Sequence, residues 1–78
     1  MSGLLQEVRD TIDGKQRLQA VFGEENGAKL ADLAIKLRSE NGSSAPDFIR
    51  WMLMDAARGS SFDAIWNHWS AKLKAVKR

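Results

Sequence analysis

Cysteine is absent from this 78-residue chain, so neither a disulfide nor a thiolate-bound metal can stabilise its fold. A chain of this length hides only about 60–65% of the surface that its unfolded form exposes, and its core is therefore thin. Small domains without such cross-links depend on closely packed helices or on a partner chain. The first residues lack the charged and apolar regions of a secretory signal. We expect a single cytoplasmic domain over residues 1–78, with self-association as an open alternative.

Tyrosine is also absent and histidine occurs once, at His68, which leaves few side chains for catalysis. Nucleophilic catalysis requires a nucleophile, a base within reach and a group that orients the base. His68 has no second histidine one helical turn away, and the adjacent carboxylates of Glu24 and Glu25 point in different directions. The serines lie where helix capping explains them. We therefore expect no enzyme, no catalytic residue, no metal, no cofactor and no small-molecule substrate.

Long apolar runs are missing as well. The longest run of large apolar residues covers 51–54, against the roughly 20 residues that a membrane-spanning helix needs. Proline occurs once, at Pro46, and β-branched residues never form an alternating run, so strands are not expected. Glycine and small polar residues recur at helix-length intervals. The sequence predicts an all-α fold, a compact bundle of four to five short helices, with a helical homodimer left open.

The N-terminal part predicts helices at 4–12 and 15–22, the second ending before Gly23. At 3.6 residues per turn, the apolar stripes of the two segments drift apart if one helix continues through Gly14. This drift favours a break at Asp13–Gly14, with Asp13 capping the second segment, although one kinked helix remains an alternative. We expect this segment to pack across the other helices. Its apolar residues are Leu4, Leu5, Val8, Ile12, Leu18, Val21 and Phe22.

Three further helices are predicted at 28–38, 46–58 and 62–77. The apolar arc of the first is wide enough to indicate burial against more than one neighbour, which is typical of a central helix. The apolar residues of the last helix fall within about 100° of arc. This stripe predicts that Trp66 and Trp69 belong to the core.

Small polar residues and glycines predict the ends of these helices. Asn26–Gly27 is expected to open the first of them. Ser44 is expected to cap the second, which has Pro46 in its first turn, and Ser60 to cap the third. Gly59 suits the left-handed conformation that ends a helix.

One face of the helix at 46–58 combines charged residues with two large apolar ones. Trp51 and Met54 lie one turn apart among these charges, which is unusual for a helix face exposed to water. Trp, Met and Arg are enriched at protein-binding surfaces. The alternative is that another helix, the N-terminal segment or a second copy of the chain covers this side. The sequence favours a non-enzymatic protein-interaction module whose candidate partner-binding residues are Arg50, Trp51, Met54 and Arg58.

Positive charge is concentrated toward the C-terminus. Residues 1–45 hold six Lys/Arg and seven Asp/Glu, whereas residues 46–78 hold six and three. Such a basic segment attracts phosphates or an acidic partner, although cations near a helix C-terminus are also favoured by the helix dipole. The candidate nucleic-acid contacts are Lys72, Lys74, Lys77 and Arg78.

Residues 22–34 resemble the first helix of the helix-turn-helix in many bacterial and phage repressor-like domains. The resemblance implies DNA binding, with the helix at 44–53 as the recognition helix and Arg50 facing outward. The connection expected at about 39–45 is longer than the three or four residues that the motif allows, and the outward face holds few of the usual base-reading residues. A small DNA-binding regulator that uses the helix at 46–58 and the basic tail is therefore the second hypothesis.

A membrane surface is a third alternative, for the segment at 62–78. Its aromatic face and lysine flank are typical of interfacial helices. Folding within the domain uses the same apolar face, so no membrane partner is expected.

Overall fold

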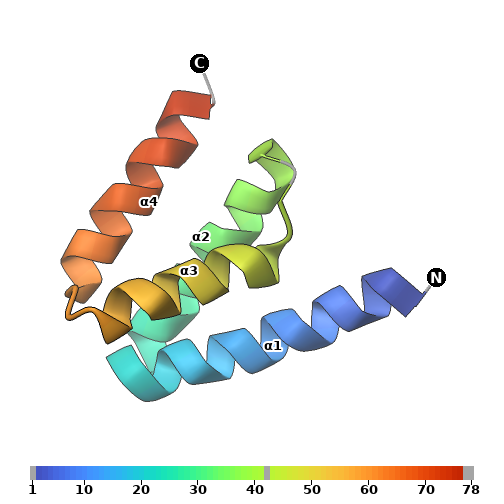
Figure 1. The fold of residues 1–78 in the computed structure, drawn as a ribbon, viewed down its shortest axis with the longest axis horizontal. Coiled ribbons are helices and arrows are strands. Elements are labelled where there is room, and N and C mark those ends of the chain that lie inside the picture. Colours follow the sequence, from blue (N-terminus) through green and yellow to red (C-terminus); the bar gives the residue numbers. More distant parts are fainter. Residues whose placement is uncertain (1, 42, 77–78) are drawn as a thin grey trace.

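The described residues form four helices and no strand, which confirms the predicted all-α fold (Figure 1). The computed structural model describes residues 2–41 and 43–76, and the side chains of residues 5–38 and 43–75. α1 runs along one edge of the bundle, and its N-terminal turns extend beyond the other helices. In chain order the helices are α1 (Ser2–Phe22), α2 (Glu24–Asn41), α3 (Ala45–Ala57) and α4 (Phe62–Val76). None of these helices is long and apolar enough to cross a bilayer.

α1 is one continuous helix, and the predicted break at Asp13–Gly14 is therefore wrong. Gly14 is buried where α1 packs against α3. A Cβ atom added at Gly14 would lie 2.6 Å from Cγ2 of Ile49, closer than real atoms approach. The glycine marks a close helix contact rather than a helix end, and Asp13 caps nothing.

The corner between α1 and α2 lies at Gly23, where the sequence predicts a helix end. Its φ of 100° is in the left-handed region that favours glycine. α2 begins directly afterwards, so the expected opening of this helix at Asn26–Gly27 is wrong. Gly27 lies within α2, where an added Cβ would come 2.3 Å from the backbone nitrogen of Gln19 in α1. Glycine at this position allows the two backbones to approach each other.

α2 is the central helix, as its wide apolar arc predicts, and it packs against each of the other three helices. Trp69 belongs to the core as predicted, whereas Trp66 is only partly buried and packs against the core from outside. The buried residues of the core are Leu18, Leu30, Ala31, Leu33, Ala34, Leu37, Phe48, Ile49, Met52, Ile65 and Trp69.

α3 begins and ends close to its predicted bounds. The backbone N–H of Asp47 donates to the Ser44 hydroxyl at 3.4 Å, and Pro46 lies in the first turn. Just after α3, Gly59 has a φ of 97°, which is the left-handed conformation predicted for it at this helix end.

α4 has a different cap from the predicted one. The backbone N–H of Ala64 donates to the hydroxyl of Ser61 at 3.2 Å, so Ser61 rather than Ser60 caps this helix. In its first turn Phe62 meets Phe22 of α1 edge-on, with ring centroids 6.2 Å apart. This contact brings the first helix and the last helix of the chain together.

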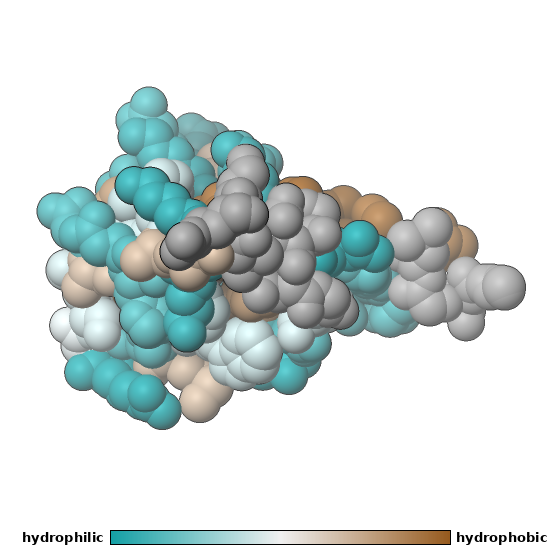
Figure 2. Space-filling view, turned by 90° about the horizontal axis from the view of Figure 1, so that it is seen from above, coloured by the Kyte–Doolittle hydropathy of each residue, from teal (hydrophilic) through white to brown (hydrophobic). Residues whose placement is uncertain are grey.

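Two different sides of α1 carry apolar residues. Gly14 and Leu18 face the core, whereas Leu5, Val8 and Ile12 remain exposed. The expectation that the whole segment packs across the other helices is therefore correct only for its C-terminal half. The two apolar stripes of α1 therefore lie on different sides of one continuous helix, as their spacing predicts. One stripe packs against the bundle, and the other remains exposed to water, along one side of the projecting arm of the molecule (Figure 2).

Candidate functional site

The outward face of α3 brings the four predicted partner-binding residues together. Their positions fall within about 100° of arc on a helix of 3.6 residues per turn. All four are exposed, and they are Arg50, Trp51, Met54 and Arg58. We call this surface the α3 face.

Trp51 is held against α4 without being buried. Its ring lies parallel to that of Trp69, with centroids 6.0 Å apart and planes 7° apart. It also meets Phe48 edge-on at 5.3 Å. Trp51 nevertheless remains 39% exposed, so a neighbouring helix covers only part of the indole. The ring is therefore an apolar contact surface whose orientation is already fixed before any partner binds.

Asp55 links the two helices behind this ring. Its Oδ2 accepts a hydrogen bond from Nε1 of Trp69 at 3.3 Å, and its Oδ1 lies 4.0 Å from Nη1 of Arg58. Sequence reasoning missed both Asp55 and Trp69 as parts of this site. The two residues are 14 positions apart on different helices, and no local spacing indicates such a contact.

The charges on the α3 face are balanced. Arg50 lies 3.5 Å from Asp47, and Arg58 lies 4.0 Å from Asp55, each pair three residues apart on the helix. Both arginines are exposed to solvent and both carboxylates are partly exposed, so each pair contributes only about 0–1 kcal/mol to stability. Their main effect is to cancel net charge, and α3 therefore presents no basic patch.

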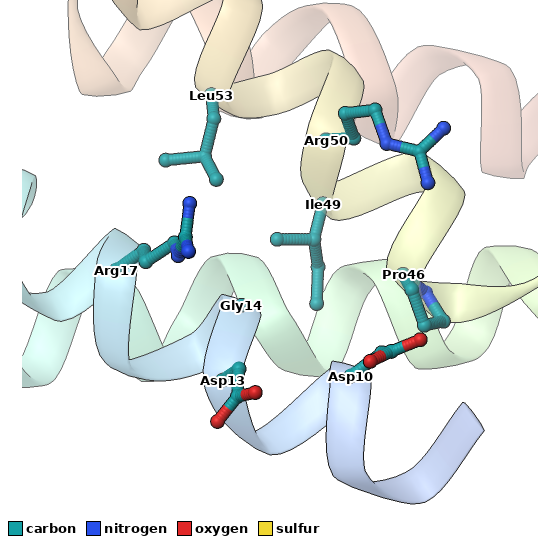
Figure 3. A pocket seen from close by; sticks show the side chains of 8 residues that line it. All are labelled: Asp10, Asp13, Gly14, Arg17, Pro46, Ile49, Arg50 and Leu53. Carbon is teal, nitrogen blue, oxygen red and sulfur yellow. The ribbon is translucent and has the colours of Figure 1, made fainter. Parts of the chain in front are cut away.

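Hollows border the α3 face on both sides. Toward α4, Trp51, Trp69 and Lys72 line a hollow of about 440 Å³. Toward α1, a hollow of about 210 Å³ lies beside Arg50, and Figure 3 shows Arg17 extending from α1 toward Leu53 there. Trp51 thus adjoins a concave surface into which a partner's side chain fits.

The predicted nucleic-acid contacts do not form one patch in the described part of the chain. Nζ of Lys72 lies 5.9 Å from the ring centroid of Trp69, beside the α3 face. Lys74 lines a separate hollow of about 630 Å³ between α2 and α4. Residues two apart on a helix point to nearly opposite sides, which explains the separation. Lys77 and Arg78 lie outside the described residues.

Glu7 of α1 and Arg38 of α2 form an ion pair on another side of the molecule. The hydrogen bond from the Arg38 guanidinium holds the pKa of the Glu7 carboxyl below its ordinary value, and the positive charge of Arg38 adds to this effect. The same contact raises the pKa of Arg38.

His68 is exposed, and its ring meets Trp69 edge-on at 4.9 Å. Within the described residues, no group of three or more His, Cys, Asp or Glu side chains is placed to hold a metal ion.

Comparison with protein-family models, curated proteins and solved structures found no match to this chain.

Proposed function

We propose that this chain is a small non-enzymatic protein-binding module whose contact surface is the α3 face. The observation that supports the proposal is Trp51, which is oriented by Trp69 yet left 39% exposed. Tryptophan residues that a partner buries completely often supply much of the binding energy of an interface. Met54, 46% exposed and one turn further along α3, extends the apolar surface, and its flexible side chain adapts to a partner's shape.

The charges around Trp51 favour a protein partner over a polyanion. Each arginine of the α3 face already has a carboxylate beside it. A surface with paired charges at its rim and an apolar centre is the usual arrangement of a protein–protein interface.

Affinity capture from the native host tests this proposal with three forms of the chain. Wild type and Val21→Ala, a change at an exposed apolar residue of α1, are expected to retain the same partner. Trp51→Ala is expected to weaken its retention by at least about tenfold, the effect of losing an interface anchor worth about 2 kcal/mol. The helical circular dichroism of Trp51→Ala serves as the folding control. A partner retained equally by all three forms would contradict the proposal.

DNA binding is the second candidate function, and one observation favours it. α2 ends at Asn41 and α3 begins at Ala45, so only residues 42–44 connect them. This connection is shorter than the sequence predicts and has the length that a helix-turn-helix allows. The two helices also cross at a steep angle in Figure 1.

A salt titration with random-sequence duplex DNA separates the two candidates. Phosphate contacts by Arg50 and Lys72 would make the affinity fall steeply with salt, and Arg50→Ala would reduce the slope of log K against log salt by about one. Trp51→Ala would leave that slope unchanged. Absence of duplex binding at low ionic strength rejects the DNA-binding candidate.

A further inference from the structure

Lys72 of α4 brings a positive charge to the edge of the α3 face. Its Nζ lies 5.9 Å from the ring centroid of Trp69, and the ring of Trp51 lies 6.0 Å from the same centroid. Lys72 and Trp51 also line the same hollow of about 440 Å³. A single segment of a partner chain can therefore contact both the exposed indole and the ammonium group.

This hollow combines an aromatic wall with hydrogen-bond donors. Its lining among the described residues is Ser43, Phe48, Trp51, Trp69 and Lys72. The three aromatic rings suit an apolar side chain. The Lys72 ammonium and the Ser43 hydroxyl can each donate a hydrogen bond to an oxygen atom. The part of the hollow that the structure describes thus has one positive charge and no carboxylate.

Lys72 differs from the arginines of the α3 face in its surroundings. Arg50 and Arg58 each have a carboxylate beside them, at 3.5 Å and 4.0 Å. Among residues 5–38 and 43–75, no carboxylate forms an ion pair with Lys72, and the side chain is exposed. A partner's carboxylate can therefore pair with Lys72 without displacing another one from it.

One available cation suits a single anionic group better than a polyanion. A nucleic-acid strand gains affinity when several cations neutralise several phosphates. Lys74, the next lysine along α4, lines a separate hollow between α2 and α4 and does not add to the charge beside Trp51. A glutamate or aspartate side chain needs only one cation, and an apolar side chain near it in the same segment can fill the aromatic part of the hollow.

We propose that the α3 face binds a protein segment in which an acidic residue lies within about one helical turn of a large apolar residue. The carboxylate pairs with Lys72, and the apolar side chain packs against Trp51. This inference rests on the proposed function, because it names the chemistry of the partner that the same face would bind.

Selection of random-sequence peptides displayed on phage, with the full chain immobilised, tests this specificity. Peptides that bind wild type but not Trp51→Ala are expected to carry an acidic residue close to a large apolar one. Selection on Lys72→Glu should instead favour Lys or Arg at that place, because the charge beside Trp51 is reversed.

Lys74→Glu is the matched control for the charge reversal. It makes the same change of charge on the same helix, but in the separate hollow, and it should select the same peptides as wild type. Lys72 and Lys74 are both exposed, so both variants should keep the helical circular dichroism of wild type.

A double-mutant cycle measures the contact directly. The peptide most enriched by wild type is compared, by isothermal titration calorimetry, with a form in which Gln or Asn replaces its acidic residue. The amide form should bind wild type at least about tenfold more weakly than the acidic form. Lys72→Gln should bind the two peptides with affinities within about twofold of each other. Oligothymidine is titrated into wild type and Lys72→Gln in the same assay.

The outcomes separate this inference from the proposed function. Peptides that require Trp51 but show no preference for an acidic residue would overturn the inference alone, as would a tenfold difference that persists in Lys72→Gln. Absence of any peptide that requires Trp51 would overturn both. Binding of oligothymidine that requires Lys72, in place of such peptides, would also overturn both and would assign the hollow to a nucleic acid.

Discussion

Gly14 of α1 lies against Ile49 of α3 with no room for a side chain between them. A Cβ at residue 14 would stand 2.6 Å from Cγ2 and 3.1 Å from Cδ1 of Ile49. α1 therefore meets α3 through its backbone, and the glycine inside this helix is explained by packing rather than by a turn.

Replacement of Gly14 by alanine is expected to destabilise the protein. Alanine gains about 1 kcal/mol in helix propensity, whereas overpacking costs about 1–3 kcal/mol. Ile49 is branched at Cβ and cannot easily rotate its Cγ2 away. We expect the free energy of unfolding in urea to fall by about 1 kcal/mol. In an Ile49→Ala background the same change should cost less or become favourable, and a stabilised single variant would contradict the packing described for this contact.

Gly27→Ala is expected to cost more than Gly14→Ala. Its added Cβ would meet the backbone of Gln19, at 2.3 Å from the nitrogen and 2.4 Å from Cα, and a backbone cannot rotate aside. Helices α1 and α2 would have to separate, at a cost of about 3 kcal/mol or more. Thermal unfolding of the two variants shows which of them loses more stability. A smaller loss of stability for Gly27→Ala than for Gly14→Ala would contradict this prediction.

Two methionines on α3 give a matched pair. Met52 is fully buried in the core, whereas Met54 is 46% exposed on the α3 face. Met52→Ala should lower the free energy of unfolding by about 2–5 kcal/mol, and Met54→Ala by about 0.5 kcal/mol or less. Urea titrations followed by circular dichroism test both values. Met54→Ala should weaken partner binding more than Met52→Ala does, when binding is measured on the folded fraction of each variant.

The Glu7–Arg38 ion pair predicts a dependence of stability on pH. Because folding lowers the pKa of Glu7, this pair stabilises the fold above the ordinary pKa of 4.5 and ceases to do so as the pH falls through the lower, folded value. Glu7→Gln removes the effect at every pH. The difference in melting temperature between wild type and Glu7→Gln should therefore be present at pH 7 and shrink toward zero at pH values well below 4.5. A difference that stays constant over this range would show that the ionisation of Glu7 does not contribute.

The glycines show where sequence-based prediction reaches its limit. Gly23 and Gly59 follow helix ends, as the sequence predicts, and both have a positive φ, which the sequence predicts for Gly59. Gly14 and Gly27 resemble those two glycines in the sequence, because each also lies beside a polar residue. They nevertheless lie inside helices, at close contacts with another helix. Local patterns cannot separate the two roles, because the difference depends on which distant residue packs against the glycine.

The candidate site was predictable in the same limited sense. Arg50, Trp51 and Met54 share one helix face, and helical periodicity alone brings them together. The support that Trp69 and Asp55 give to this face depends on how α3 and α4 pack. The exposed stripe on α1 was misassigned for a related reason, since an apolar pattern identifies a face to be covered but not the molecule that covers it.

The backbone contacts at Gly14 and Gly27 fix the direction in which α1 leaves the bundle. The exposed N-terminal half of α1 and the α3 face consequently keep a constant separation and relative direction. A molecule that contacts both surfaces has to match that separation. Substitutions that loosen either glycine contact would therefore weaken its binding without altering a residue that it touches.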